Sequence, residues 1–254
     1  MTNGKKRVVT AAVIVVGVGL LLLAGGLVAG SGNMGFKLTV AMDAQGAISP
    51  ALNSNSGTNY VGLPYRPRFD LTNAQSLWFA IIAAEPNSSP TINRHNKATD
   101  GFFFYAFGSD ATNSLSNFAL QPGEAYSIKV TEDAPLPVIG AHVPDTIVTL
   151  YKQGEGSFPP IGNPSASGTN YFAPPYNAVA ATAQELWFEI GQDGAIINRH
   201  NQVTDGFFFY AFGSDPNDTC VPFSQPGCNN FPIVPGEGYS VKVTSTLNYQ
   251  PLHY

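Results

Sequence analysis

The chain repeats itself once, and this repeat constrains the fold more than any other feature of the sequence. The segment Thr99–Asp110 recurs residue for residue as Thr204–Asp215. Shorter matches flank it in the same order: SGTNY at 56–60 and 167–171, AQSLWF at 74–79 and AQELWF at 183–188, INRHN at 92–96 and 197–201, PGEAYSIKV at 122–130 and PGEGYSVKV at 235–243. Such a unit is one structural module, so we expect two tandem modules of the same fold.

Each repeat has the pattern of a small, mainly β module. Glycine and proline are abundant, with 26 and 20 residues, and charged residues make up only 11% of the chain. Alternating segments at 36–40 and 146–150 predict a leading strand, and the matches after the helix predict further strands joined by Asp-Gly and Pro-Gly-Glu turns. We therefore predict two antiparallel β-sandwich or open-barrel modules, each with one short helix.

The helix of each repeat has a recognisable start. Thr182 and Glu185 fit the capping-box pattern, and Thr72 to Gln75 is a weaker version of it. Three apolar residues in each repeat are expected to face the core. They are Leu77, Trp78 and Ile81 in the first and Leu186, Trp187 and Ile190 in the second.

The aromatic strand is apolar on both faces, which a strand half-exposed to water would not be. One face is expected to fill the module core, and the other to meet the helix, the sister module or a partner. Burial of the strand wholly within its own module is the alternative. The candidate contact residues predicted on this strand are Phe103, Tyr105 and Phe107, with Phe208, Tyr210 and Phe212. Tyrosines of the loops and the C-terminal tail complete the candidate interface: Tyr60, Tyr65, Tyr171, Tyr176 and Tyr254.

An uncharged run from Val8 to Ala29 follows Lys5, Lys6 and Arg7. A helix of that length covers the hydrocarbon core of a bilayer, and preceding cations favour a cytoplasmic N-terminus. Gly26 and Gly30 form a GxxxG, which lets membrane helices approach closely. A cleaved signal peptide is the alternative, although its apolar region is usually shorter. We expect a retained anchor in the cytoplasmic membrane, with the C-terminal body in the periplasm or outside the cell.

The resulting domain organisation has three parts. Residues 1–30 are the cytoplasmic tip and anchor, 31–142 the first β module, and 143–254 the second. The segment 132–145 holds three prolines and is expected to be a semi-rigid linker. The body after the anchor carries a surplus of acidic residues, which excludes nucleic acid as a partner on electrostatic grounds.

Cys220 and Cys228 both fall in a loop that the first repeat lacks. In an exported chain this pair is expected to form a disulfide that fixes the insertion. A metal pair would need further histidine or cysteine ligands nearby, and the sequence around them offers none.

Two other features are candidate sites. His95 and His200 suggest metal or acid–base chemistry, against the simpler interpretation of a ring packed at a strand end. Arg94 and Arg199 are expected to pair with Asp100 and Asp205. Oxygen-rich loops at 108–113 and 213–218 suggest weak calcium binding, but the same residues are common in ordinary turns. We predict no metal site and no cofactor.

The order of Gly-Thr-Asn-Tyr, Pro-Tyr, a Thr-Ala-Gln-x-Leu helix, Ile-Asn-Arg and Pro-Gly-Glu-Gly-Tyr resembles a repeat of exported bacterial proteins with no assigned function. The likeness covers about 200 residues in two copies. It departs from that pattern at His95 and His200, where the family usually has tryptophan. The resemblance implies an extracytoplasmic β module and no particular chemistry.

Enzyme signatures are absent from the sequence: there is no nucleophile elbow, phosphate-binding loop, zinc-protease motif or dinucleotide fingerprint. The expected function is a non-catalytic, membrane-anchored accessory or scaffold subunit of a larger membrane-protein complex, photosynthetic or respiratory among the options. Its expected partners are other membrane-protein subunits and the lipid bilayer. A surface glycan or polymer-binding module is one alternative, and a filament or surface-layer subunit is another.

Overall fold

The structure is a computed structural model of the chain. It describes residues 35–46, 56–63, 66–67, 71–141, 146–176, 178–191, 195–217 and 229–252. The part from Gly35 to Tyr254 forms one unit. Within it two similar β-rich modules follow one another, each with one short helix, which confirms the mainly β, tandem organisation predicted from the repeat.

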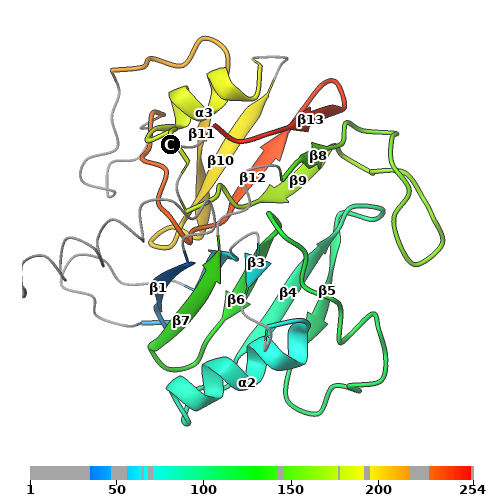
Figure 1. The fold of residues 1–254 in the computed structure, drawn as a ribbon, viewed down its shortest axis with the longest axis vertical. Helices are drawn as coiled ribbons and strands as arrows, with labels where there is room; N and C mark the ends of the chain where they lie inside the picture. The colour runs from blue at the N-terminus through cyan, green and yellow to red at the C-terminus, as the bar shows by residue number, and fades with distance from the viewer. Residues whose placement is uncertain are drawn as a thin grey trace, which may run out of the picture. The chain divides into compact units, whose positions relative to one another are not determined.

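The first module contains two antiparallel sheets and a helix (Figure 1). Its elements are β1 (Gly35–Met42), β2 (Thr58–Gly62), β3 (Arg66–Pro67), α2 (Ala74–Ala84), β4 (Thr91–Asn96), β5 (Gly101–Tyr105), β6 (Ala125–Lys129) and β7 (Ala134–Ala141). The strand order is β2-β6-β4-β5 in one sheet and β1-β7-β3 in the other. Helix α2 contacts β7, β4 and β5, so it closes the core between the sheets.

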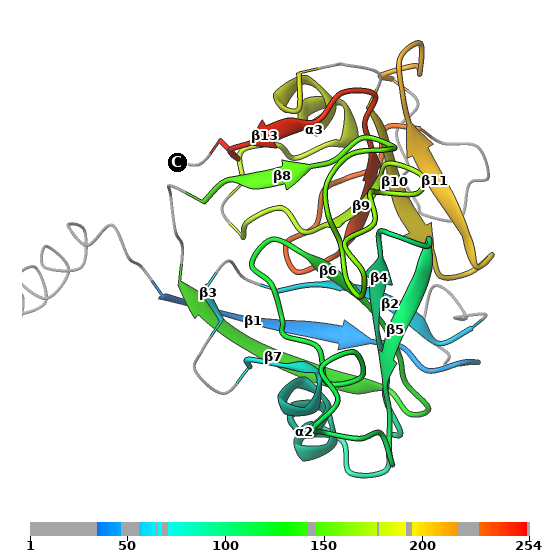
Figure 2. The same cartoon turned by 90° about the vertical axis from the view of Figure 1, so that its right-hand side faces the viewer.

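The second module repeats this plan with a smaller second sheet. Its elements are β8 (Val148–Leu150), β9 (Thr169–Phe172), α3 (Ala183–Glu189), β10 (Ile196–Asn201), β11 (Gly206–Tyr210), β12 (Tyr239–Lys242) and β13 (Leu247–Tyr249). The order β9-β12-β10-β11 matches that of the first module strand for strand. Strand β8 pairs with β13 as β1 pairs with β7. Figure 2 shows the two strands of each pair lying next to one another.

Both helices begin with a reciprocal cap. In α3, Thr182 Oγ1 accepts from the Glu185 backbone N–H at 3.2 Å while the Glu185 carboxylate accepts from the Thr182 N–H, as predicted. In α2 the cap is Asn73 with Ser76, one residue later than the predicted Thr72. The asparagine amide oxygen accepts the Ser76 N–H at 2.9 Å, and this bond sets the first turn of the helix.

Each module has its own hydrophobic core. The first core contains Leu77 and Ile81 of α2. The second contains Leu186 and Trp187 of α3 and Ile190, which directly follows the helix. Trp78 packs against the first core while remaining partly exposed. The helix residues therefore face inward as predicted.

The aromatic strands face the opposite way from the prediction. Tyr105, Phe208 and Tyr210 are buried in the cores, and Phe103 packs against one. The exposed rings within the strands are Phe102, Phe104, Phe207 and Phe209. Because both faces of the strand are apolar, the sequence pattern does not determine which face the helix covers. Beyond the strand ends, Phe107 and Phe212 are exposed.

The predicted linker is largely a strand. Residues 134–141 form β7, which pairs with β1 from Gly35↔Ala141 to Met42↔Ala134. Pro135 and Pro137 alternate along it, so both lack an N–H on the same edge. On the side away from β1, the only described strand beside β7 is β3, which pairs at Gly140 and Ala141 alone. Prolines are compatible with such an open edge, so they do not interrupt the pairing with β1.

Several predicted features lie outside the described residues. They are the anchor with Lys5, Lys6, Arg7, Gly26 and Gly30, the pair Cys220 and Cys228, and the loop tyrosine Tyr65 and terminal Tyr254. Among the residues that are described, no helix has both the length and the apolar character needed to cross a bilayer.

Candidate functional site at the module contact

The two modules meet through backbone hydrogen bonds that come from equivalent positions. The Gly62 N–H donates to the Gly236 carbonyl at 2.9 Å, and the Ala173 N–H donates to the Gly123 carbonyl at 2.9 Å. Gly62 and Ala173 follow the Asn-Tyr of each repeat, while Gly123 and Gly236 belong to the two Pro-Gly-Glu turns. Each module therefore uses the same two segments to contact the other, as the subunits of a two-fold dimer do.

Aromatic rings occupy the centre of this contact. Tyr60 and Tyr171 stack with ring centroids 5.6 Å apart and planes 10° from parallel. The ring centroid of His200 lies 4.9 Å from that of Tyr60, and the ring centroid of His95 lies 4.7 Å from that of Tyr171. Each tyrosine therefore lies between the other tyrosine and the histidine of the other module. Burial raises the pKa of both tyrosine hydroxyls, which therefore remain protonated across the physiological range.

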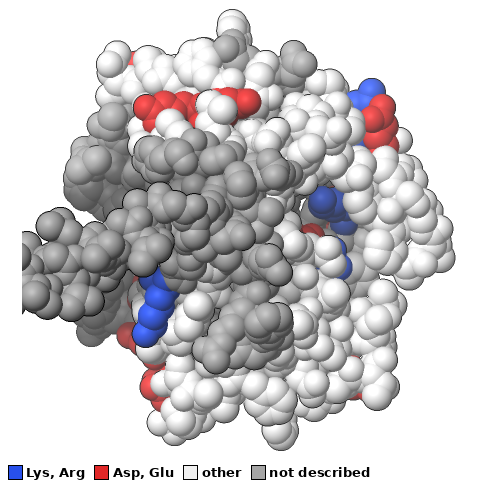
Figure 3. Space-filling model, viewed as in Figure 1, with Lys and Arg blue, Asp and Glu red and all other residues white. Residues whose placement is uncertain are grey.

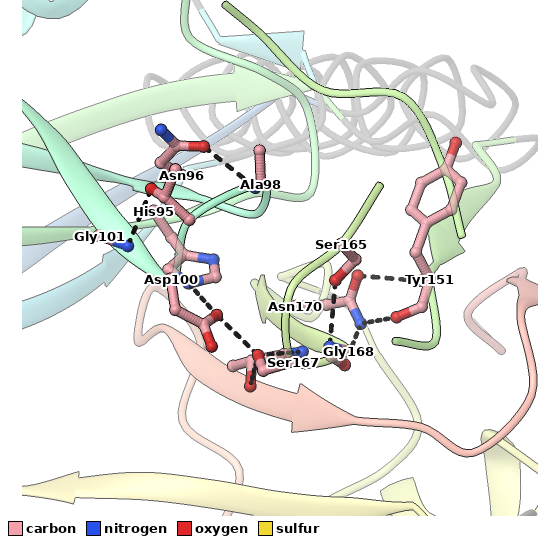
Figure 4. Close-up of polar contacts among 12 residues, drawn as sticks. His95, Asn96, Ala98, Asp100, Gly101, Tyr151, Ser165, Ser167, Gly168 and Asn170 are labelled. Carbon is pink, nitrogen blue, oxygen red and sulfur yellow. Dashed lines mark hydrogen bonds and ion pairs between the residues drawn. The ribbon is translucent and has the colours of Figure 1, made fainter. Parts of the chain in front are cut away.

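Each histidine is joined to the other module through an aspartate. Ser167 Oγ donates to Asp100 Oδ1 at 2.6 Å, and His95 Nε2 lies 3.2 Å from the same oxygen (Figure 4). The equivalent group has Ser56 at 2.6 Å and His200 at 3.0 Å from Asp205 Oδ1. The repeated motif thus supplies a serine of one module to the His-Asp pair of the other.

The turn residues Asp100 and Asp205 are held in an uncommon backbone conformation. Their φ angles are 58° and 56°, in the left-handed region where aspartate is more tolerated than most residues. The turn aims the carboxylate back at the histidine five residues earlier and across at the sister module. This geometry explains why a Thr-Asp-Gly sequence follows the histidine strand in both repeats.

The two arginines pair with glutamates, and not with the aspartates predicted from the sequence. Arg94 Nε lies 2.9 Å from Glu124 Oε2. Arg199 makes two contacts with Glu237, Nε to Oε1 at 2.8 Å and Nη2 to Oε2 at 2.8 Å. The prediction was wrong because Asp100 and Asp205 turn toward the histidines, whereas the Pro-Gly-Glu turns of β6 and β12 lie beside the arginines.

The buried state of the histidines decides their chemistry. Burial lowers the pKa of His95 and His200, and their aspartates only partly offset this effect. In neither ring does Nδ1 have a hydrogen-bond partner among the described residues. With an ionised aspartate as acceptor, Nε2 carries the proton and Nδ1 is the bare, buried nitrogen. Each ring is therefore a neutral donor to its aspartate.

This arrangement is not that of a nucleophilic triad. In such a triad the serine hydroxyl bonds to the histidine, which removes its proton. Here Ser167 and His95 both bond to one oxygen of Asp100, and no serine–histidine hydrogen bond is present in the described part of the chain. In the same part, no three histidine, cysteine or acidic side chains gather in a way that could hold a metal ion. The serine, aspartate and histidine of each group instead join the two modules, with the aspartate as the shared acceptor.

Buried tyrosines form hydrogen bonds to the two Pro-Gly-Glu turns that contact the other module. The Tyr126 hydroxyl accepts from the Gln121 N–H at 2.6 Å and lies 3.2 Å from Glu124 Oε2. Tyr239 repeats this with the Val234 N–H at 2.6 Å and Glu237 Oε2 at 3.1 Å. These bonds fix the two Pro-Gly-Glu turns before they meet the other module.

On the outside of each module the helix and the aromatic segment form an exposed cluster, here called the aromatic patch. Phe79 and Phe107 flank Trp78 at 5.3 Å and 6.4 Å between ring centroids. In the second module Phe188 and Phe212 flank Trp187 at 5.4 Å and 6.4 Å. Phe107 and Phe212 are 84% and 87% exposed, the highest values among the large apolar residues described.

The predicted candidate residues that the structure describes therefore separate into four groups. Phe107 and Phe212 lie in the aromatic patches, Tyr60 and Tyr171 join the two modules, and the remaining strand residues belong to the cores. Tyr176 lies outside these three groups and is exposed. Ser56 and Ser167 were not predicted, although their place in the repeated SGTNY motif was a usable signal. Asn59 and Asn170 of the same motif were also missed.

Comparison with known proteins identifies no relative. No protein-family model, no curated protein and no solved structure matches the chain.

Proposed function

We propose that the chain is a non-catalytic, membrane-anchored accessory subunit that stabilises a larger membrane-protein assembly from its extracytoplasmic side. The observation that carries the proposal is the aromatic patch, which occurs at equivalent positions in both modules. Exposed apolar clusters of this kind mark surfaces that contact other proteins. Two similar patches, one on each of two modules in contact, suit a subunit that bridges its neighbours.

The same patches favour protein contact over glycan binding. Sugar platforms combine a ring face with polar atoms, and here the most exposed rings are phenylalanines, which have none. The two indole N–H groups are already used, since Trp78 donates to the Pro90 carbonyl at 3.0 Å and Trp187 to the Ala195 carbonyl at 2.9 Å. The apolar surface is thus better suited to burial in a protein interface.

The proposal is tested by purifying the full chain from its own membranes in a mild detergent and identifying what remains bound by mass spectrometry. A double variant, Phe107→Ser with Phe212→Ser, removes the most exposed ring of each patch. Ile161→Ser is the matched control, because Ile161 is 77% exposed but lies outside the patches.

We expect a stoichiometric set of membrane subunits with the wild type and the control, and its loss with the double variant. A lone monomer in every preparation would overturn the proposal and favour glycan binding. A polymer of this chain would instead indicate a filament, which β5 and β11 could extend because each pairs with only one described strand.

A further inference from the structure

A hollow at the module contact is lined by two cationic side chains and only one carboxylate. It is lined by Arg94, Lys97 and the 121–124 turn of the first module and by 148–150, Asn170 and Tyr171 of the second. Its volume is about 120 Å³. Figure 3 shows Lys and Arg side chains, in blue, within a hollow of an otherwise mostly uncharged surface.

Lys97 is held in this hollow by aromatic rings. Its ammonium nitrogen lies 5.5 Å from the ring centroid of Tyr151 and 5.3 Å from that of Phe158, both in the loop after β8. These are cation–π distances. Within the described part of the chain no hydrogen bond or ion pair of this ammonium group is present, and Lys97 is one of the residues that line the hollow.

Arg94 adds a second set of unused donors. Its Nε binds Glu124, and its two terminal nitrogens make no further hydrogen bond to the described residues. A guanidinium edge of this kind matches the planar geometry of a carboxylate or phosphate group, while an ammonium adds a compact positive charge. Two cations face one carboxylate here, which leaves the hollow positive.

The repeat supplies a natural comparison. The equivalent hollow of the other half has a volume of about 350 Å³ and is lined by Asp43 and Glu237, with no lysine or arginine in its lining. Gln202 replaces Lys97 there and donates to Asn59 Oδ1 at 2.8 Å. Arg199 is occupied at two nitrogens by Glu237. The two halves thus share a backbone plan but differ in charge at this point.

We infer that the hollow around Arg94 and Lys97 is a binding site for a small oxyanion, a carboxylate or phosphate group. The group is either a free anion or the terminal carboxylate of a partner chain, which presents the same atoms. The inference goes beyond the proposed function and stands whether or not the chain is an accessory subunit. Burial lowers the pKa of Lys97, and although Glu124 opposes this shift, Arg94 adds to it, so a bound anion would favour the charged amine.

The test is isothermal titration calorimetry of the full chain in a nonionic detergent and bis-Tris chloride buffer, which contains no oxyanion. The probes are inorganic phosphate, acetate, an acetylated trialanine with a free C-terminus and the same peptide as its C-terminal amide. Lys97→Gln copies the residue found at the equivalent position of the second module. Lys242→Gln makes the same change of charge at an exposed strand residue and is the control.

We expect saturable one-to-one binding of at least one oxyanion probe, weakened at least tenfold by Lys97→Gln and unchanged by Lys242→Gln. If the peptide with a free C-terminus binds more tightly than acetate and its C-terminal amide does not bind, the ligand is a chain terminus. Binding of phosphate or acetate without the peptide would identify a free anion. Absence of binding by every probe, or equal binding by the Lys97→Gln variant, would overturn the inference.

A second measurement needs no variant. If Lys97 supplies the charge, acetate affinity falls as the pH rises through the lowered pKa of its amine, at a pH below the ordinary 10.5. Acetate itself stays ionised throughout that range. An affinity that does not change with pH up to 10.5 would contradict the assignment of Lys97.

Discussion

Gly238 of the second module lies directly against Ala125 of the first, and the two residues hold the same position in their repeats. A Cβ atom on Gly238 would be 2.5 Å from that of Ala125. Gly62 and Ala173 form the second such pair, also at 2.5 Å. At each position one module carries glycine where the other carries alanine. Two copies of either module would place two alanines together, so this contact suits only unlike modules.

Replacing Gly238 by alanine is expected to destabilise the protein by about 1–3 kcal/mol, the usual cost of an overpacked contact. Ala125→Gly in the same chain should restore most of the loss, since the other neighbours of the new Cβ lie at 3.4 Å, an ordinary contact. Urea unfolding of the two single variants and the double variant measures this coupling. A Gly238→Ala variant as stable as the wild type would contradict the packing described here.

At Gly62 the same experiment should give a different result. A Cβ on Gly62 would meet the Ala173 methyl at 2.5 Å and also the Glu237 carbonyl oxygen at 2.9 Å. Ala173→Gly can relieve only the first of these contacts. We therefore expect Gly62→Ala to be rescued in part by Ala173→Gly, and less completely than Gly238→Ala by Ala125→Gly. Equal rescue at both sites would show that the backbone near Glu237 moves freely.

The buried histidines should make the folded state sensitive to mild acid. Burial lowers the pKa of His95 and His200 below the ordinary 6.5, so between the lowered values and 6.5 the unfolded chain binds more protons than the folded one. Stability is then fully present above pH 6.5 and is lost as the pH falls through the lowered pKa values. Glu237 works in the opposite direction because burial raises its pKa.

The histidine contribution is isolated by comparing the wild type with a variant carrying both His95→Gln and His200→Gln. Urea unfolding between pH 4.5 and 8 gives the free energy of unfolding of each. The difference between the two proteins should shrink or change sign on acidification. A difference that stays constant over this range would mean that the imidazoles do not titrate within the contact.

Local patterns in the sequence predict the modules, the helices and most strands, because the repeat doubles every signal. They do not predict which face of the aromatic strand is buried, since Phe102 to Tyr105 is apolar on both faces and the helix determines the outcome. The prolines of β7 predict a linker from the sequence alone. They are compatible with a strand because β1 pairs along the edge of β7 that does not need the proline N–H groups. The partners of Arg94 and Arg199 lie on turns 30 and 38 residues further along the chain. The hollow around Arg94 and Lys97 is formed by segments of both modules.

Asn170, a buried polar residue of strand β9, should tolerate almost no change. Its side-chain amide nitrogen donates to the carbonyls of Tyr151 and Gly168, both at 3.0 Å, and to that of Val241 at 3.3 Å. Asn170→Asp would aim a carboxylate at the same three oxygens. A buried polar group left without its partner costs about 1–3 kcal/mol, and more when it is charged.

We therefore expect Asn170→Asp to lose at least this much stability at pH 7, with part of it regained at low pH as the carboxyl becomes protonated. Asn59→Asp should behave alike, because Asn59 bonds the carbonyls of Asp43, Gly57 and Ile128 in the same way. Asn217→Asp, at an exposed turn, is the control and should change stability by less than about 0.5 kcal/mol. Thermal or urea unfolding at pH 7 and pH 4 decides the matter: an Asn170→Asp variant that unfolds like the control would mean that the three carbonyl bonds contribute nothing to holding the SGTNY segment in place.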